Sequence, residues 1–246
     1  MSGHSKWANI KNKKAKGDAN KAKIFTKLGR EIAVAVKSGG SDPSTNSKLF
    51  DAIANAKMNN MPNDNIARGI KKAAGELGDI NYENISYEGY GIAGSAIIIE
   101  TLTDNKNRTA GDIRHIFDKY GGAMGTTNCV SYMFDRKGVI VCEREETMTE
   151  DSIFELVLES GAEDVSIEED VFEAYVGQGE ISAIRNIFEE KGLTLISAGM
   201  EWIPQSTMTL DGDNLIKFQK MIDAFEDNDD VQKVYHNVDL PIELDE

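Results

Sequence analysis

The sequence predicts an α+β protein of several domains, with an N-terminal three-helix bundle followed by two α/β domains, one inserted in the other. Three observations predict this class. Apolar residues recur at helical spacing through the first 80 residues, and strand-like and helix-like segments alternate from residue 83 onward. Charge is also divided by position: residues 1–76 contain 15 Lys and Arg against 6 Asp and Glu, whereas the whole chain of 246 residues has a net charge of −15.

The composition indicates a globular chain without a membrane span. The hydrophobic fraction is 40%, no run approaches the ~18 apolar residues of a membrane helix, and no apolar stretch of a signal peptide follows the basic start. Cys129 and Cys142 lie thirteen residues apart and predict reduced thiols in a cytoplasmic protein. The histidines His4, His115 and His236 are far apart, so neither a metal site nor a cofactor is expected.

The first helix is predicted from Asp18 to about Ser38, with Gly39-Gly40 ending it. One face carries its apolar residues: Ile24, Phe25, Leu28, Ile32, Ala35 and Val36. The opposite side carries four cations, here called the basic stripe: Lys23, Lys27, Arg30 and Lys37. The pattern therefore predicts one buried face and one row of positive charge.

Two further helices complete the predicted bundle. Asp42 and Pro43 resemble the N-cap and first residue of a second helix, which ends at Met61-Pro62. A third helix has two faces, apolar (Ile66, Ile70, Ala73 and Leu77) and basic (Arg68, Lys71 and Lys72).

The segment before the first helix is too polar to pack, yet it carries an aromatic residue among cations. These residues are Lys6, Trp7, Lys11, Lys13, Lys14 and Lys16. Such an arm suits a phosphate backbone, with Trp7 available for stacking on a base. Two alternatives stay open: a lysine-rich helix face is usually just solvated, and Trp7 fits equally well as a hydrophobic plug against the bundle.

The first α/β region is predicted from alternating patterns. Its elements are strands at 83–90 and 95–102, a polar loop at 103–109, a helix at 110–120 and a strand at 129–134. A β-α-β-β-α-β order follows: strand 138–142, helix 150–160, strands 164–167 and 172–176, helix 181–191 and strand 193–197. This is the order of a ferredoxin-like domain.

The last predicted elements can complete the interrupted first α/β region. They are a strand at 207–210, a helix at 214–225 and a strand at 231–238. We therefore expect a basic helical domain at 1–80, a discontinuous α/β domain at 81–136 and 204–246, and an inserted ferredoxin-like domain at 137–203.

Most motifs that suggest catalysis have simpler explanations. Residues 89–94 match GxGxxG, but a strand follows directly where a nucleotide site needs a helix, so a hairpin turn is predicted. Acidic clusters fall in turns and helix ends, which is typical of solvated surface. The polar loop is different, because Asn105, Lys106, Asn107 and Arg108 lead into a helix N-terminus and can donate hydrogen bonds to a phosphate or a base edge. The alternative is a loop that satisfies its own backbone.

Seven short motifs resemble a known family. They are Gly3–Lys11, Lys23–Lys27, Asn59–Pro62, Asp64–Ile66, Thr103–Asn105, Asn107–Thr109 and Cys129–Phe134. On these motifs the chain resembles the YebC/PmpR family over essentially its whole length. The resemblance implies one helical and two α/β domains, a cytoplasmic DNA-binding transcriptional regulator, and no established enzymatic activity. Other members, including a mitochondrial translational activator of cytochrome c oxidase, act in translation, on ribosomes stalled at proline-rich stretches or on a specific mRNA.

The sequence thus predicts a non-enzymatic, monomeric regulator that binds nucleic acid, with DNA as the first candidate. The expected contacts are Lys6, Trp7, Lys11, Lys13, Lys14, Lys16, Lys23, Lys27, Arg30, Asn105, Lys106, Asn107 and Arg108. A translation factor that binds ribosomal or messenger RNA is the alternative within this class, because lysines recognise the backbone charge of both polymers. A protein-binding adaptor and an unrecognised hydrolase are the alternatives from other classes.

Overall fold

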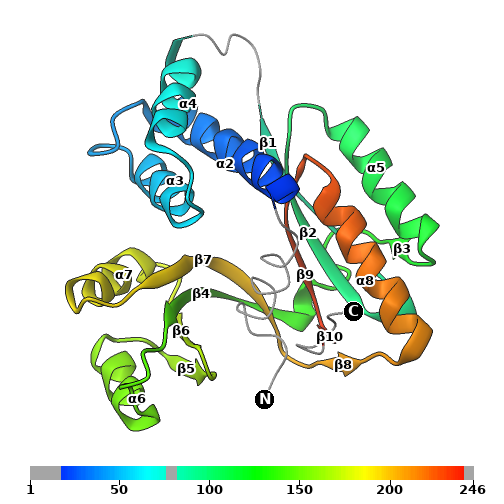
Figure 1. Ribbon diagram of the computed structural model, residues 1–246. Coiled ribbons are helices and arrows are strands. Elements are labelled where there is room, and N and C mark those ends of the chain that lie inside the picture. Colours follow the sequence, from blue (N-terminus) through cyan, green and yellow to red (C-terminus); the bar gives the residue numbers. More distant parts are fainter. Residues whose placement is uncertain (1–17, 76–81, 241–246) are drawn as a thin grey trace. The chain divides into compact units, whose positions relative to one another are not determined.

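A computed structural model describes residues 18–75 and 82–240, which fall into two compact units (Figure 1). Of the described residues, one unit holds 134–205 together with 239–240, and the other holds those up to 133 and from 206 to 238. The α+β fold class is confirmed. The division into three domains stays a prediction, because the helical region and the first α/β region share one unit. No described helix is long and apolar enough to cross a membrane.

Three helices form the start of the described chain: α2 (Asp18–Gly39), α3 (Ser47–Met58) and α4 (Asn63–Gly75). The predicted end of the first helix is confirmed, since Gly40 has a φ of +88° and its N–H donates to Val36 O at 2.8 Å. The buried residues of the three helices form one hydrophobic core. Their apolar faces therefore meet as the helical periodicity predicts.

The predicted start of the second helix at Asp42-Pro43 is wrong. The N-cap is Asn46, whose side-chain oxygen accepts from the Leu49 N–H at 3.1 Å. The Asn46 amide nitrogen also donates to Ala35 O and Gly40 O, at 2.7 and 2.8 Å, and ties the end of α2 to the start of α3. Asp42 instead stabilises the preceding turn, accepting from Ser44 N at 2.9 Å. Both Asp and Asn favour N-caps, so only the tertiary contacts of Asn46 decide between them.

The second unit contains an antiparallel sheet with strand order β3-β1-β2-β9. Its strands are β1 (Glu83–Tyr90), β2 (Ala96–Thr103), β3 (Ala123–Met124) and β9 (Val231–His236). Helices α5 (Lys106–Lys119) and α8 (Gly212–Asp227) lie side by side (Figure 1), and the rings of Phe117 and Phe225 meet edge to face at 4.9 Å. Short strands β8 (Met208–Thr209) and β10 (Val238–Asp239) flank α8 and β9 in sequence.

The hairpin predicted for the GxGxxG match is confirmed. Residues 91–95 join the antiparallel strands β1 and β2 through a 3-10 turn at Ile92–Gly94. Ala93 and Gly94 both have positive φ values, 54° and 80°, which a tight reversal requires. The glycines of this match therefore belong to the turn that reverses the chain between β1 and β2.

The strand predicted at 129–134 is wrong. Ser131–Met133 forms a 3-10 turn, and strand β4 (Phe134–Glu143) begins only afterwards. The buried carboxylate of Glu88 accepts backbone N–H groups from Asn128, Val130 and Ser131, at 2.8, 2.9 and 2.9 Å. Burial alone would raise the pKa of Glu88, but these bonds outweigh it and lower the pKa. A side chain from another strand thus holds this segment in a loop.

We expect Glu88→Gln to destabilise this loop by about 2 kcal/mol. The glutamine amide is neutral and has one acceptor oxygen, whereas the carboxylate accepts the three N–H groups through two charged oxygens. Hydrogen exchange at Asn128, Val130 and Ser131 measures the effect. The control is Glu83→Gln, an exposed position on the same strand. Equal protection in the two variants would contradict the anchoring role of Glu88.

The unit of residues 134–205 has the predicted ferredoxin-like order. Its elements are β4, α6 (Glu150–Glu159), β5 (Asp164–Ile167), β6 (Val171–Val176), α7 (Ile181–Glu190) and β7 (Leu195–Pro204). The strand order is β5-β6-β4-β7, and all neighbours are antiparallel. Residues of both helices join one core with alternate residues of β4 and β6, for example Ile153 and Phe188 with Ile140 and Phe172. Strands β4 and β7 are longer than predicted because they pair along their full length.

Candidate nucleic-acid interface

Helix α2 separates an apolar face from a charged one, as its sequence predicts. Leu28, Ile32, Ala35 and Val36 are buried, at 5% exposure or less, in the core shared with α3 and α4. The stripe on the other side is half-buried at Lys23, Lys27 and Arg30 and exposed at Lys37. The charged face is therefore partly covered.

A short acidic stretch covers part of this face. It comprises residues 226–230, which include the last two residues of α8 and the three that follow, and is here called the acidic segment. Lys23 Nζ lies 2.7 Å from Asp227 Oδ1, and Lys27 Nζ donates to Glu226 O at 2.8 Å. Arg30 Nη1 donates to Asp229 O at 2.7 Å and to Asp230 Oδ1 at 2.8 Å. Three cations of the predicted phosphate-binding stripe thus bind carboxylate or backbone carbonyl oxygens of the same chain, about 200 residues away in sequence.

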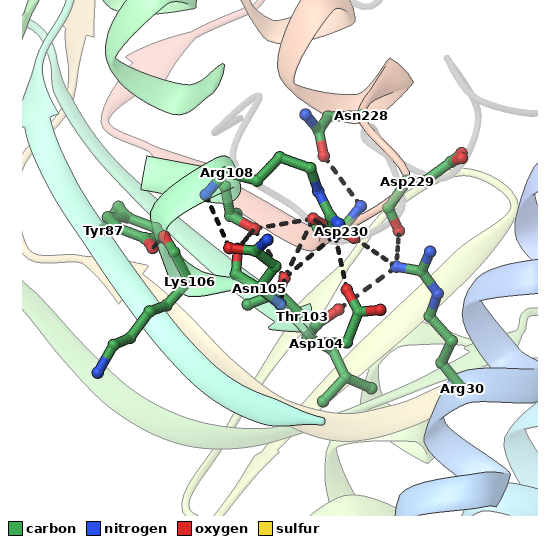
Figure 2. Close-up of polar contacts among 12 residues, drawn as sticks. Arg30, Tyr87, Thr103, Asp104, Asn105, Lys106, Arg108, Asn228, Asp229 and Asp230 are labelled. Carbon is green, nitrogen blue, oxygen red and sulfur yellow. Dashed lines mark hydrogen bonds and ion pairs between the residues drawn. The ribbon is translucent and has the colours of Figure 1, made fainter. Parts of the chain in front are cut away.

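At the buried end of this contact, several side chains gather around the carboxylate of Asp230 (Figure 2). Its side chain is 5% exposed and accepts from two guanidinium groups, Arg30 through Oδ1 and Arg108 through Oδ2, both at 2.8 Å. The hydroxyls of Thr109 and Thr103 lie 2.8 and 3.2 Å from Oδ2. Burial alone would raise the pKa of Asp230, but hydrogen bonds from Arg108, Thr109 and Arg30 lower it. The carboxylate is therefore a charged anchor that joins α2, α5 and the start of β9.

A second contact joins α2 to the sheet. Burial raises the pKa of Glu31, although the charge of Lys233 on β9 and a hydrogen bond from Asn55 at 3.2 Å oppose the shift. The nearby Glu100 on β2 raises it further. Glu31 thus lies among charged groups of β2 and β9, on the same helix as the stripe.

The polar loop predicted at 103–109 is largely helical, which corrects the sequence prediction. Helix α5 begins at Lys106, four residues earlier than expected, because the Asn105 side chain accepts from Arg108 N at 3.1 Å and caps the helix. Arg108 pairs with Asp104 and Asp230, both at 2.8 Å, and these bonds raise its pKa. Lys106 and Asn107 are exposed, and Figure 2 shows the Lys106 side chain directed away from the Asp230 cluster.

The structure therefore divides the predicted contacts into three groups. Lys6, Trp7, Lys11, Lys13, Lys14 and Lys16 lie outside the described residues. Lys23, Lys27, Arg30 and Arg108 bind acidic or carbonyl groups of the chain itself. Lys106 and Asn107 are exposed at the start of α5, where Asn105 is the helix cap.

Another cationic surface lies on α4, outside the predicted set of contacts. Arg68, Lys71 and Lys72 are exposed and fall within about 100° of arc on one helix. We call them the α4 cationic face. Arg68 bonds to Asn65 and to Asp64 O, and among the described residues no acidic side chain forms an ion pair with Lys71 or Lys72. The sequence shows this face as the polar side of the third helix, and only the structure shows that it is uncovered while the stripe is not.

The described residues hold no group of three or more His, Cys, Asp and Glu placed to bind a metal ion. Cys142 is buried, and burial raises its pKa to about 12. Cys129 is half-buried, and desolvation raises its pKa as well. Neither thiol has the lowered pKa of a reactive cysteine.

The fold and this interface define a multidomain α+β protein with a cationic helical region at its N-terminus. Residues 5–76 match the family model described as TACO1/YebC protein N-terminal domain, and residues 82–238 match the model described as TACO1/YebC second and third domain. The chain belongs to the TACO1/YebC family, which confirms the resemblance seen in its motifs.

Relatives and a solved structure agree over nearly the full length. A protein of Acetivibrio thermocellus named "Probable transcriptional regulatory protein" is 55% identical over 96% of this chain and 98% of its own. "Probable transcriptional regulatory protein Teth39_1009" of Thermoanaerobacter pseudethanolicus is 51% identical over 100% of both chains. The crystal structure of the conserved hypothetical protein Aq1575 from Aquifex aeolicus is similar with a TM-score of 0.84 and 42% identity, covering 94% of this chain and 95% of that one.

Proposed function

We propose that this protein is a non-enzymatic regulator that binds nucleic acid through its N-terminal helical region. The observation that carries the proposal is the α4 cationic face, where three exposed cations share one side of a helix. The residues after position 76 contain 12 Lys and Arg against 36 Asp and Glu. This acidic body repels a polyanion and directs it to the helical region. The names of the relatives support a regulatory role.

Duplex DNA is the first candidate ligand, because the relatives are named as transcriptional regulators. Ribosomal or messenger RNA is the second, since exposed lysines bind the phosphodiester backbone of either polymer. We propose that the chain acts in the cytoplasm as a monomer. The arm residues Lys6, Trp7, Lys11, Lys13, Lys14 and Lys16, together with the exposed Lys106 and Asn107, stay candidates for further contacts.

Binding should depend strongly on salt. If about six cations contact phosphate, the logarithm of the affinity for duplex DNA falls against the logarithm of salt concentration with a slope of about −5. Fluorescence anisotropy with labelled duplex DNA and with RNA of the same length, across a series of KCl concentrations, measures this slope. An affinity that does not change with salt would contradict the proposal.

Ultraviolet crosslinking in cells identifies the polymer. The tagged protein is recovered and the bound DNA and RNA are both sequenced, with an Arg68/Lys71/Lys72→Glu variant as the control. Promoter DNA that is lost in the variant supports a transcriptional regulator, and ribosomal RNA that is lost supports a translation factor. Recovery of neither polymer would favour a protein-binding adaptor.

A further inference from the structure

The two ends of the contact between the basic stripe and the acidic segment differ in burial. At one end, Arg30 and Asp230 form an ion pair with side chains 19% and 5% exposed, and Asp230 also holds Arg108. At the other end, Lys23 and Asp227 form an ion pair with side chains 42% and 67% exposed. Buried pairs resist exchange because breaking them leaves a charge without solvent, whereas exposed pairs are weak and screened by salt. The contact therefore has a fixed end and an exchangeable end.

The acidic segment presents to α2 oxygen atoms that accept hydrogen bonds from cations, as the oxygens of a phosphodiester backbone do. Lys23 meets a carboxylate, and Lys27 meets the carbonyl of Glu226 in the last turn of α8. The C-terminus of a helix carries a partial negative charge, which adds to that of the acidic side chains. A row of carboxylate and carbonyl oxygens thus lies along successive turns of α2, where phosphate oxygens could take their places.

We propose that the acidic segment is a competitor of nucleic acid, and that a phosphodiester backbone displaces Asp227 from Lys23 and the Glu226 carbonyl from Lys27 while Arg30 stays bound to Asp230. The inference rests on the proposed function. The α4 cationic face makes the first contact, and the exchangeable end of the stripe adds to it only after this displacement. Arg30 is then a structural residue, and Lys23 and Lys27 are the phosphate contacts of α2.

Zero-length crosslinking tests the competition directly in the full-length chain. A carbodiimide condenses the Asp227 carboxylate with the Lys23 amine into an amide, with loss of water to the reagent, and mass spectrometry measures the yield. The Lys191–Glu159 pair is an internal control, because it is 3.5 Å apart and similarly exposed, at 43% and 62%. Duplex DNA and double-stranded RNA of equal length are the probes, and anisotropy measures their binding in parallel.

Competition predicts a selective loss of the Lys23–Asp227 crosslink. At a probe concentration about ten times the Kd, mass action leaves about a tenth of the original yield, and the control crosslink is unchanged. The polymer that lowers the yield of the Lys23–Asp227 crosslink at the lower concentration is the better ligand. If the probe binds and the crosslink persists, or if both crosslinks fall equally, the inference is overturned and the proposed function stands. If neither probe binds, both are overturned.

A charge-neutral variant gives a second measurement. Asp227→Asn removes the competitor and should bind duplex about two- to fivefold more tightly, the range expected for one exposed ion pair. Asp213→Asn is the matched control, because it makes the same change of charge at an exposed position near the other end of α8. Equal affinities of the two variants would overturn the inference.

Discussion

Asp230→Asn is expected to lower the free energy of unfolding of the second unit by about 3 kcal/mol. The substitution keeps the shape of the side chain and removes the charge that Arg30 and Arg108 share. Removing one partner of a buried ion pair lowers the free energy of unfolding by about 3–5 kcal/mol. The lower end of this range applies because the guanidinium of Arg108 is half-exposed and is hydrated when its partner is lost. Native-state hydrogen exchange of α5 and β9 reports the second unit by itself.

The control is Asp229→Asn, which makes the same change of charge one residue earlier on an exposed side chain. It should change stability by less than about 0.5 kcal/mol. Similar effects of the two substitutions would show that net charge, and not the Asp230 cluster, stabilises the unit.

The effect of Asp230 should also depend on pH in one direction. Because its pKa is lower in the folded state, the carboxylate stabilises the fold fully above the ordinary Asp pKa of about 3.9, and this contribution is lost as pH falls through the lowered value. The difference between the parent chain and Asp230→Asn should thus be constant from neutral pH down to about pH 5 and should shrink below about pH 4. A difference that grows on acidification would contradict this account.

Replacement of Arg68, Lys71 and Lys72 by Gln is expected to weaken nucleic-acid binding by about 100-fold at low salt. Each lost phosphate contact lowers the salt slope by about 0.9 for duplex DNA, so three contacts change it by about 3. The side chains are exposed, so stability should change little. Anisotropy against salt concentration measures both the affinity and the slope.

The matched control for this triple variant replaces Lys119, Lys217 and Lys220 by Gln. These lysines are also exposed, but they lie on α5 and α8 of the acidic body. The control has the same net charge as the α4 variant and should keep most of the affinity. An equal loss of affinity in both variants would mean that the affinity depends on net charge alone and that nucleic acid does not bind specifically at α4.

Several elements could be predicted from the sequence because their causes are local. The spacing of apolar residues in α2 and the glycines at its end predict the bounds of this helix. The alternation of polar and apolar residues predicts strands β1 and β5. The failures also have physical causes. Asp42 and Asn46 are both good caps, and contacts of Asn46 with the end of α2 decide between them. Residues 129–134 have a strand-like composition, but the carboxylate of Glu88, about 40 residues earlier, binds N–H groups at 128, 130 and 131 and holds the start of this segment as a loop.

The candidate site was predicted less completely than the fold. The uneven distribution of charged residues along the chain and the helical periodicity together predict the basic stripe and the cationic side of the third helix. The stripe was expected to be open, but Lys23 and Arg30 bind carboxylates 204 and 200 residues away in sequence. No periodicity within one segment can show such a pair.

The sequence by itself determined where this protein is positively charged and which helices are amphipathic, because both depend on residues a few positions apart. Only the tertiary structure decided which of those charges are uncovered. Chain folding brings the acidic segment onto α2 and leaves the α4 cationic face without a paired acidic side chain among the described residues. Charge counts along a chain therefore predict a polyanion partner, whereas the three-dimensional pairing of charges decides where that partner can bind.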